Sequence, residues 1–212
     1  MIDVSAVLFD CDGVLVDSAA SVERAWRRWA TEHGLDEDAV IAIAHGRRTE
    51  DTLLDLGFSD DLAAEVERLE GAEVADAASV AAFPEAAALL PLLPRDAWAV
   101  VTSGTHALVT SRLAAAGLPV PSVLVTANDV AAGKPDPEGY LEAARRLGRP
   151  ATDCLVIEDA PAGVEAALAA GMRVVALPTT HPVDELAAAT LVAPWEDIVV
   201  RVNGKRVELA LR

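Results

Sequence analysis

The 212-residue sequence predicts an α/β protein: a doubly wound, parallel-sheet (Rossmann-like) core, a small inserted α-helical bundle that forms a cap domain, and a C-terminal β-hairpin. Three observations support this prediction. Short apolar runs alternate with helical patterns, as in sheets whose two faces are both covered by helices. A long helical stretch without strand patterns interrupts the alternation after the first run. An Asn-Gly pair between two apolar segments near the end of the chain favours a hairpin.

Buried strands are predicted where short runs of β-branched and other apolar residues occur. These runs cover residues 6–9, 98–101, 123–126, 155–157 and 174–177. Strands that are covered on both faces read as continuous apolar runs, without the alternation of a half-exposed strand. We therefore expect these runs to form one parallel sheet.

Helices are predicted between the later strands, over residues 106–116, 137–147 and 160–170. Each is followed by a glycine at the position where a residue with positive φ commonly ends a helix. Near the end of the chain, residues 198–202 and 206–211 flank Asn203-Gly204. This pair predicts a hairpin whose type I′ turn is centred on these two residues.

The segment from residue 18 to residue 82 has helical periodicity and no convincing strand. The helical patterns cover residues 22–32, 38–44, 50–56 and 60–74. The simplest account is a helical domain inserted after the first strand. We therefore expect residues 1–17 and 83–212 to form the Rossmann-like core and residues 18–82 to form the cap domain.

Charge and composition exclude two classes of partner. The formal net charge is −17 and no run is basic, whereas nucleic-acid phosphates bind clustered Lys and Arg. No window approaches the roughly 18 uninterrupted apolar residues of a membrane span. We therefore expect no nucleic-acid partner and no membrane partner.

The start of the chain and its cysteines bear on the compartment. Residues 1–9 lack a basic segment and their apolar run ends at Asp10, so they do not resemble a signal peptide. Cys11 and Cys154 are too few for a disulfide framework and are expected to be structural thiols. A cytoplasmic protein is the resulting prediction.

The sharpest chemical feature is Asp10-Cys11-Asp12-Gly13, directly after the first predicted strand. The carboxyl ends of parallel strands form the ligand crevice of an open sheet, so both carboxylates are expected to point into it. Two carboxylates this close repel each other, which raises one pKa or recruits a cation. One can act as nucleophile and the other as general acid and base. The alternative is an ordinary turn, since Asp and Gly are common turn residues.

Two further motifs follow later strands. Thr102-Ser103-Gly104 offers a hydroxyl and backbone N–H groups near a helix start, which suit phosphate oxygens, although such residues also commonly connect a strand to a helix. Lys134 lies in a Gly-Lys-Pro-Asp-Pro loop. A lone loop lysine is usually solvated, but its place between Gly and Pro indicates a defined position.

The fourth motif is Glu158-Asp159, after the strand predicted at residues 155–157. Carboxylate oxygens are the ligands that hard cations prefer, and Mg²⁺ would keep waters and a phosphate oxygen as its other ligands. The alternative is that Asp159 only caps the following helix. Together, the four motifs specify a site far more closely than any one of them does.

On these motifs and the inserted helical segment, the chain resembles the haloacid dehalogenase superfamily of phosphohydrolases over nearly its whole length. The resemblance implies that Asp10 is the nucleophile and Asp12 the general acid and base, with Thr102 and Lys134 also catalytic. It implies Mg²⁺ as the cofactor. The implied metal site consists of Asp10, the backbone carbonyl of Asp12, Asp159 and, close by, Glu158.

Two short segments, His45-Gly46-Arg47-Arg48-Thr49 and Thr102-Ser103-Gly104-Thr105, resemble members that act on glycerol phosphate and on sugar phosphates such as 2-deoxyglucose 6-phosphate. The expected substrate is therefore a small phosphorylated metabolite. The residues expected to bind it are Ser103 and Gly104 in the core and His45, Arg47 and Arg48 in the cap. Alternatively, the two arginines pair with Glu50 and Asp51 at an exposed helix start.

Three other functions compete with phosphomonoester hydrolysis through an aspartyl phosphate. A β-phosphoglucomutase-like sugar phosphomutase would share every core residue, but that kind carries a cap-side His where this chain has Val22. A dehalogenase would lack a second acid, which Asp12 provides. A non-catalytic metabolite-binding module is expected to have lost Asp10 or Lys134. The physiological substrate, the oligomeric state and the role of the cap arginines stay open.

Overall fold

The computed structural model describes residues 1–204 and 206–212. A six-stranded sheet with order β6-β5-β2-β7-β8-β9 forms its centre, and every pairing in that sheet is parallel. Its strands are β2 (Ala6–Phe9), β5 (Trp98–Val101), β6 (Leu124–Val125), β7 (Cys154–Glu158), β8 (Arg173–Ala176) and β9 (Leu191–Val192). The predicted parallel sheet is confirmed. Strand β9 was not predicted; its two residues follow the Ala-rich segment 187–189.

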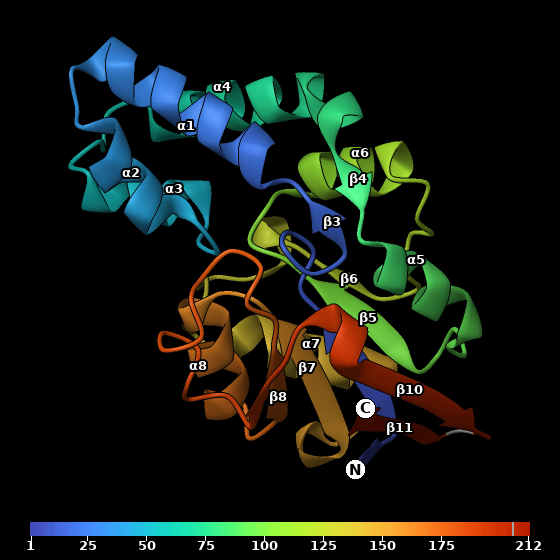
Figure 1. Ribbon diagram of the computed structural model, residues 1–212. Helices are drawn as coiled ribbons and strands as arrows, with labels where there is room; N and C mark the ends of the chain where they lie inside the picture. Colours follow the sequence, from blue (N-terminus) through green and yellow to red (C-terminus); the bar gives the residue numbers. More distant parts are fainter. Residues whose placement is uncertain (205) are drawn as a thin grey trace.

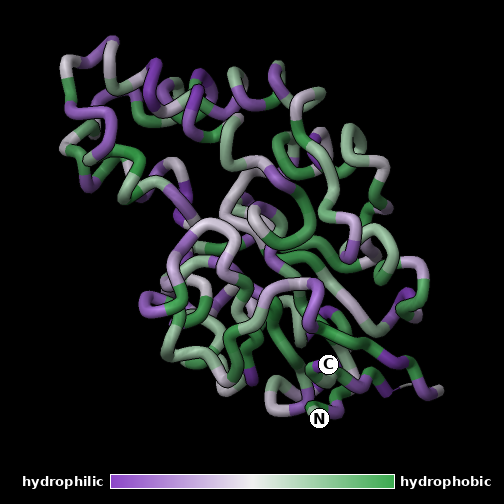
Figure 2. Tube along the Cα trace, viewed as in Figure 1, coloured by the Kyte–Doolittle hydropathy of each residue, from purple (hydrophilic) through white to green (hydrophobic). Residues whose placement is uncertain are grey.

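Alternate side chains of β2 face two separate hydrophobic layers. Phe9 packs on one side with Leu113, and Leu8 packs on the other side with Tyr140. The helices that cover the sheet are α6 (His106–Ala115), α7 (Glu138–Leu147) and α8 (Pro161–Ala169). Burial on both faces explains why the strands read as continuous apolar runs, drawn green in Figure 2. Among the described residues, no helix has both the length and the apolar character needed to cross a bilayer.

A second, antiparallel sheet with order β1-β11-β10 packs beside the first and holds both chain termini (Figure 1). It consists of β1 (Ile2–Val4), β10 (Ile198–Asn203) and β11 (Arg206–Leu211). The predicted hairpin is present, but the prediction that Asn203 is a central turn residue is wrong. Asn203 pairs with Arg206, so the connection begins at Gly204, which has φ 63°. Glycine adopts this conformation without strain, and residue 205 lies outside the described residues.

Helices α1 to α4 form the cap, which stands to one side above the sheet in Figure 1. Their bounds are α1 (Ala19–His33), α2 (Glu37–Ala44), α3 (Thr49–Asp55) and α4 (Leu62–Ala75). Trp29 is the centre of their own hydrophobic cluster, with the rings of Trp26 and Phe58 at 5.8 and 4.7 Å. All described members of that cluster lie between residues 22 and 69. This supports our proposed division into a core of residues 1–17 and 83–212 and a cap of residues 18–82.

The two connections between cap and core run side by side. Strand β3 (Val16–Asp17) pairs antiparallel with β4 (Ala81–Ala82), and α5 (Pro84–Leu89) follows at once. No strand was predicted within residues 18–82, and β4 corrects that prediction; it is too short to leave a pattern. Proline at the first position of α5 suits a helix start, because the first N–H groups of a helix lack partners within it.

Candidate active site

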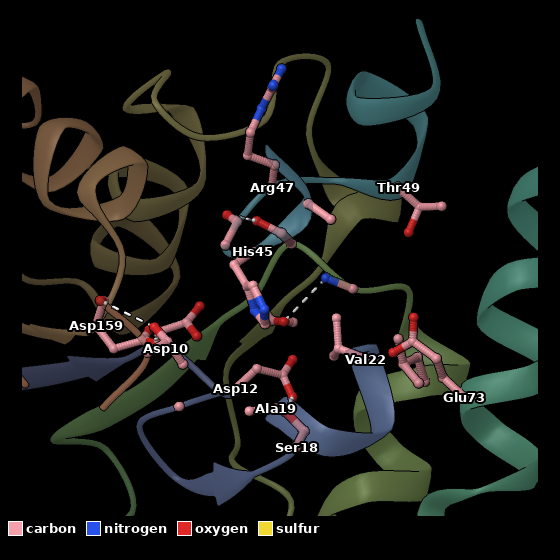
Figure 3. Close-up of a pocket in the computed structure, with 18 of the residues that line it drawn as sticks. Asp10, Asp12, Ser18, Ala19, Val22, His45, Arg47, Thr49, Glu73 and Asp159 are labelled. Carbon is pink, nitrogen blue, oxygen red and sulfur yellow. Dashed lines mark hydrogen bonds between the residues drawn. The ribbon is translucent and has the colours of Figure 1, made fainter. Parts of the chain in front are cut away.

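Loops at the carboxyl end of the sheet converge on a pocket between core and cap. The residues drawn in Figure 3 line this pocket, including Asp10 and Asp12 after β2, Asp159 after β7, and His45 from the cap. The structure therefore brings together motifs that are more than a hundred positions apart in the chain. This convergence at the carboxyl ends of parallel strands follows the rule for open α/β sheets.

Asp10 lies directly after β2 and is 6% exposed. Its backbone N–H donates to the carbonyl of Ile157 at 2.9 Å, which holds it level with the end of β7. Its carboxylate accepts a hydrogen bond from the Lys134 ammonium. Burial raises the pKa of Asp10 to about 7, with Lys134 opposing the shift and Glu158 adding to it.

Glu158 anchors Lys134. The Lys134 ammonium donates to Glu158 Oε1 at 2.5 Å, and the Tyr140 hydroxyl donates to the same oxygen at 3.1 Å. The other oxygen, Oε2, accepts the backbone N–H groups of the next two residues at 2.6 and 2.8 Å. Each oxygen of Glu158 thus already accepts two hydrogen bonds. Its main contribution is to hold the lysine beside the nucleophile position.

Asp10, Glu158 and Asp159 form a buried acidic cluster in which one carboxylate oxygen from each residue lies within 4.8 Å of the other two. Burial and the neighbouring Glu158 raise the pKa of Asp159 well above its ordinary value. The alternative that Asp159 caps α8 is wrong, since the capping residue is Ala160 and Asp159 instead accepts from the Thr180 hydroxyl. Three buried carboxylates beside one lysine leave negative charge uncompensated, and such an oxygen cluster could bind a hard metal cation.

The loop after Asp10 passes very close to this cluster. Gly13 has φ 73°, and a Cβ atom there would lie 2.0 Å from an Asp159 carboxylate oxygen. Only glycine permits both the conformation and the approach. The indole N–H of Trp195 donates to the carbonyl of Val14 at 3.0 Å and fixes the loop from the opposite side.

Asp12 is held from two directions. Its Oδ1 accepts from the Ser18 hydroxyl at 2.6 Å, and its Oδ2 accepts from the Arg112 guanidinium at 2.8 Å. Arg112 also donates to Glu73 of cap helix α4. Sequence reasoning missed Arg112 and Glu73. The available signal was an arginine on the otherwise apolar, buried face of α6, next to Leu113.

The motif after β5 contacts the cap. The Thr102 hydroxyl accepts the N–H of Gly104 at 3.1 Å, and the Ser103 hydroxyl donates to the carbonyl of Gly46 at 2.9 Å. Gly46 has φ 75°, and a Cβ atom there would lie 2.4 Å from the Cβ of Ala160. The structure thus places Thr102, Ser103 and Gly104 at the pocket, with the Ser103 side chain directed to the cap.

The three predicted cap residues point in different directions and have different partners. His45 extends toward the aspartates, whereas Arg47, at the pocket rim, extends away from them (Figure 3) and pairs with Asp55 at 2.7 Å. Burial, with His181 nearby, lowers the pKa of His45. Arg48 pairs with Asp51 at 2.7 Å, which is the alternative considered for it above. Its guanidinium is not among the groups that line this pocket.

The comparisons with known proteins agree with this geometry. The profile of the haloacid dehalogenase-like hydrolase family matches residues 4–171. The chain belongs to this family. Hexitol phosphatase A of Escherichia coli is 47% identical over 175 residues, 80% of this chain and 81% of the relative. Glycerol-1-phosphate phosphohydrolase 2 of Saccharomyces cerevisiae is 36% identical over 197 residues, 86% of this chain and 78% of the relative.

A solved structure supports the same assignment. A hydrolase from Pseudomonas syringae aligns with a TM-score of 0.80 at 30% identity, covering 89% of this chain and 93% of that one. The predicted superfamily, its Rossmann-like fold with inserted cap, and the prediction of a phosphatase are confirmed.

We expect the free energy of unfolding of this haloacid dehalogenase-like hydrolase, without metal, to fall as pH rises from about 4 to about 7. Because the folded-state pKa of Asp10 is about 7 and its ordinary value is 3.8, the folded state binds more protons in this window. The stability contributed by the protonated Asp10 is fully present below pH 3.8 and is lost as pH rises through about 7. Thermal unfolding in chelator across this range measures it. Asp10→Asn should reduce the slope, and an unchanged slope would contradict the assignment.

Proposed function

We propose that this phosphatase hydrolyses the phosphomonoester of a small sugar or polyol through an aspartyl phosphate on Asp10, with Mg²⁺ as cofactor. The observation that carries the proposal is the convergence of Asp10, Asp12 and Asp159 on one pocket beneath the cap, with the Lys134 ammonium donating to Asp10. The two relatives described above are named for hexitol and glycerol phosphates, which are polyol phosphates. The cytoplasmic location predicted from the sequence is part of this proposal.

The catalytic cycle consists of two phosphoryl transfers. In the first, an Asp10 oxygen bonds to phosphorus, the bond from phosphorus to the alcohol oxygen breaks, and Asp12 donates a proton to that oxygen. In the second, the oxygen of a water molecule bonds to phosphorus, Asp12 accepts a proton from that water, and the bond from phosphorus to the Asp10 oxygen breaks. Phosphate then leaves and the Asp10 carboxylate is restored. Lys134 and the Thr102 hydroxyl stabilise the charge on the phosphoryl oxygens.

The acidic cluster suits Mg²⁺, since its ligand atoms are hard carboxylate oxygens whose negative charge Lys134 does not fully neutralise. Asp10, Asp159 and the backbone carbonyl of Asp12 would hold the ion. Both oxygens of Glu158 are already occupied by hydrogen bonds, so we assign Glu158 to the support of Lys134. When bound, the ion would neutralise phosphoryl charge and offset the repulsion within the cluster.

The leaving-group side of the pocket favours an uncharged alcohol. Apolar Val22, Trp26 and Leu108 line it. Of the described arginines that line the pocket, Arg47 is paired with Asp55, and Arg112 is paired with two carboxylates. A second anionic group would therefore find no unpaired arginine there. This disfavours both a carboxylate-bearing substrate and the bisphosphate intermediate that a sugar phosphomutase must hold.

The test is a panel of phosphomonoesters with Mg²⁺, followed by release of inorganic phosphate. We expect hexitol and glycerol phosphates to exceed phosphoglycolate by about tenfold or more in kcat/KM, since about 1.4 kcal/mol of unfavourable charge placement is a factor of ten. Sugar 1-phosphate should release phosphate without conversion to the 6-phosphate. Isomerisation faster than phosphate release would overturn the hydrolase assignment in favour of a mutase.

A further inference from the structure

Arg112 joins Asp12, the proton donor proposed above, to the cap through one buried side chain. Its side chain is 3% exposed and donates from Nη1 to Asp12 at 2.8 Å and from Nη2 to Glu73. Glu73 lies on cap helix α4 and its side chain is 4% exposed. A continuous chain of charged contacts therefore runs from the cap to Asp12.

We propose that Arg112 is a positioning residue that holds the Asp12 carboxylate for proton transfer, and that Glu73 couples this position to the docking of cap helix α4 on the core. The proposal rests on the function proposed above for Asp12 as general acid and base. It extends that function by naming two residues, outside the four motifs, on which proton transfer to the leaving group depends.

The orientation of Asp12 depends on two donors from different parts of the chain. Ser18, which precedes cap helix α1, donates to one carboxylate oxygen, and Arg112 on core helix α6 donates to the other. A carboxylate held at both oxygens has one orientation. If Arg112 is lost, only the Ser18 contact remains, and the carboxylate can rotate about it.

The position of Arg112 in turn depends on Glu73. The Nε atom of Arg112 is buried and has no hydrogen-bond partner among the described residues. The guanidinium is thus held by its two carboxylate partners. When a buried arginine loses one of its two carboxylate partners, its buried position becomes strongly unfavourable, because the cost of removing the guanidinium from water is no longer compensated. Movement of α4 away from α6 would therefore release Arg112 and, through it, Asp12.

A neighbouring contact shows that α4 is docked at this point of the core. Glu70, one helical turn before Glu73, accepts hydrogen bonds from the Thr49 hydroxyl at 3.1 Å and from the Thr105 hydroxyl at the start of α6. Residues three apart lie on the same side of a helix. Glu70 thus docks the cap helix on α6, while Glu73 contacts the arginine that reaches Asp12.

The test compares two leaving groups. Glycerol 1-phosphate needs a proton on its departing alcohol, whereas p-nitrophenyl phosphate releases a stable anion, so the initial p-nitrophenolate burst does not depend on a proton donor. For Arg112→Met, we expect kcat on glycerol 1-phosphate to fall by about 10²-fold with KM little changed, because general acid catalysis contributes about 10²–10⁴-fold. The p-nitrophenolate burst rate should change little.

Three further variants make the test decisive. Glu73→Gln should show the same selectivity with a smaller loss, and the double variant should lose no more than Arg112→Met, because the two residues act through one contact chain. Arg112→Lys keeps the charge but not the fork that reaches both carboxylates, so it should be intermediate. If Arg112→Met fails to fold, Arg112→Lys takes its place in the comparison of the two substrates.

The outcomes separate this proposal from the function on which it rests. Equal loss on both substrates for Arg112→Met and Arg112→Lys, while Asp12→Asn is selective for glycerol 1-phosphate, would reduce Arg112 to a structural ion pair and overturn the proposal. An Asp12→Asn variant without that selectivity would instead refute the role of Asp12 itself. Additive losses in the double variant would show that Glu73 does not act through Arg112.

Discussion

Asp10→Asn is expected to abolish phosphate release, with kcat lower by about 10⁴-fold or more, since removal of a catalytic nucleophile costs on the order of 10⁴–10⁶. The amide keeps the shape of the carboxylate but cannot form the aspartyl phosphate. Free phosphate from glycerol 1-phosphate is the measurement, and a beryllofluoride adduct on the wild-type Asp10 is the matching positive observation.

The fold should survive this change. Asp10 is buried and burial raises its pKa to about 7, so replacing it with a neutral side chain of the same size removes an unfavourable buried charge. We therefore expect the metal-free Asp10→Asn protein to melt no lower than the wild type at neutral pH. Asp17→Asn, at an exposed carboxylate in β3, is the matched control and should keep full activity. Residual activity of Asp10→Asn above a few per cent would refute the covalent mechanism.

Removal of the divalent metal is expected to lower activity by about 10²–10³-fold, the usual cost of removing one stabilising group for transition-state charge. Added Mg²⁺ should restore it. The acidic cluster of Asp10, Glu158 and Asp159 contains three buried carboxylates with Lys134 beside two of them, so a bound cation relieves repulsion in the folded state. Mg²⁺ should therefore also raise the melting temperature, by the equivalent of about 2.7 kcal/mol at a hundred times its Kd.

The carboxylate of Asp159 is expected to be essential for Mg²⁺ binding. Asp159→Asn should lose both the Mg²⁺-dependent rise in melting temperature and most of the activity. Asp184→Asn, at an exposed carboxylate in the segment that follows Thr180, should lose neither. Activity that persists in excess chelator, or an Mg²⁺-dependent melting shift that survives Asp159→Asn, would contradict the proposed metal site.

Features that depend on neighbours along the chain were predictable. The buried strand before Asp10, the helical segment of residues 18–82 and the turn at Gly204 leave patterns in composition or in the choice of glycine. Strand β9 and the position of the hairpin turn escaped prediction. Strand β9 has only two residues beside an Ala-rich segment, and a shift of the turn by one residue leaves the apolar runs on either side of it unchanged.

The class of fold, the family and the motifs that meet at the pocket follow from the amino-acid sequence, because the carboxyl ends of parallel strands lie at one edge of the sheet. The pairing of the charged groups follows from how distant elements pack. Arg112 reaches Asp12 across 100 positions and Glu73 across 39, and no local pattern encodes a partner so distant. The same holds for Arg47, which turns to Asp55 and away from the pocket centre. Local periodicity records which face of an element is buried, whereas the partner of a buried charge depends on how separate elements pack.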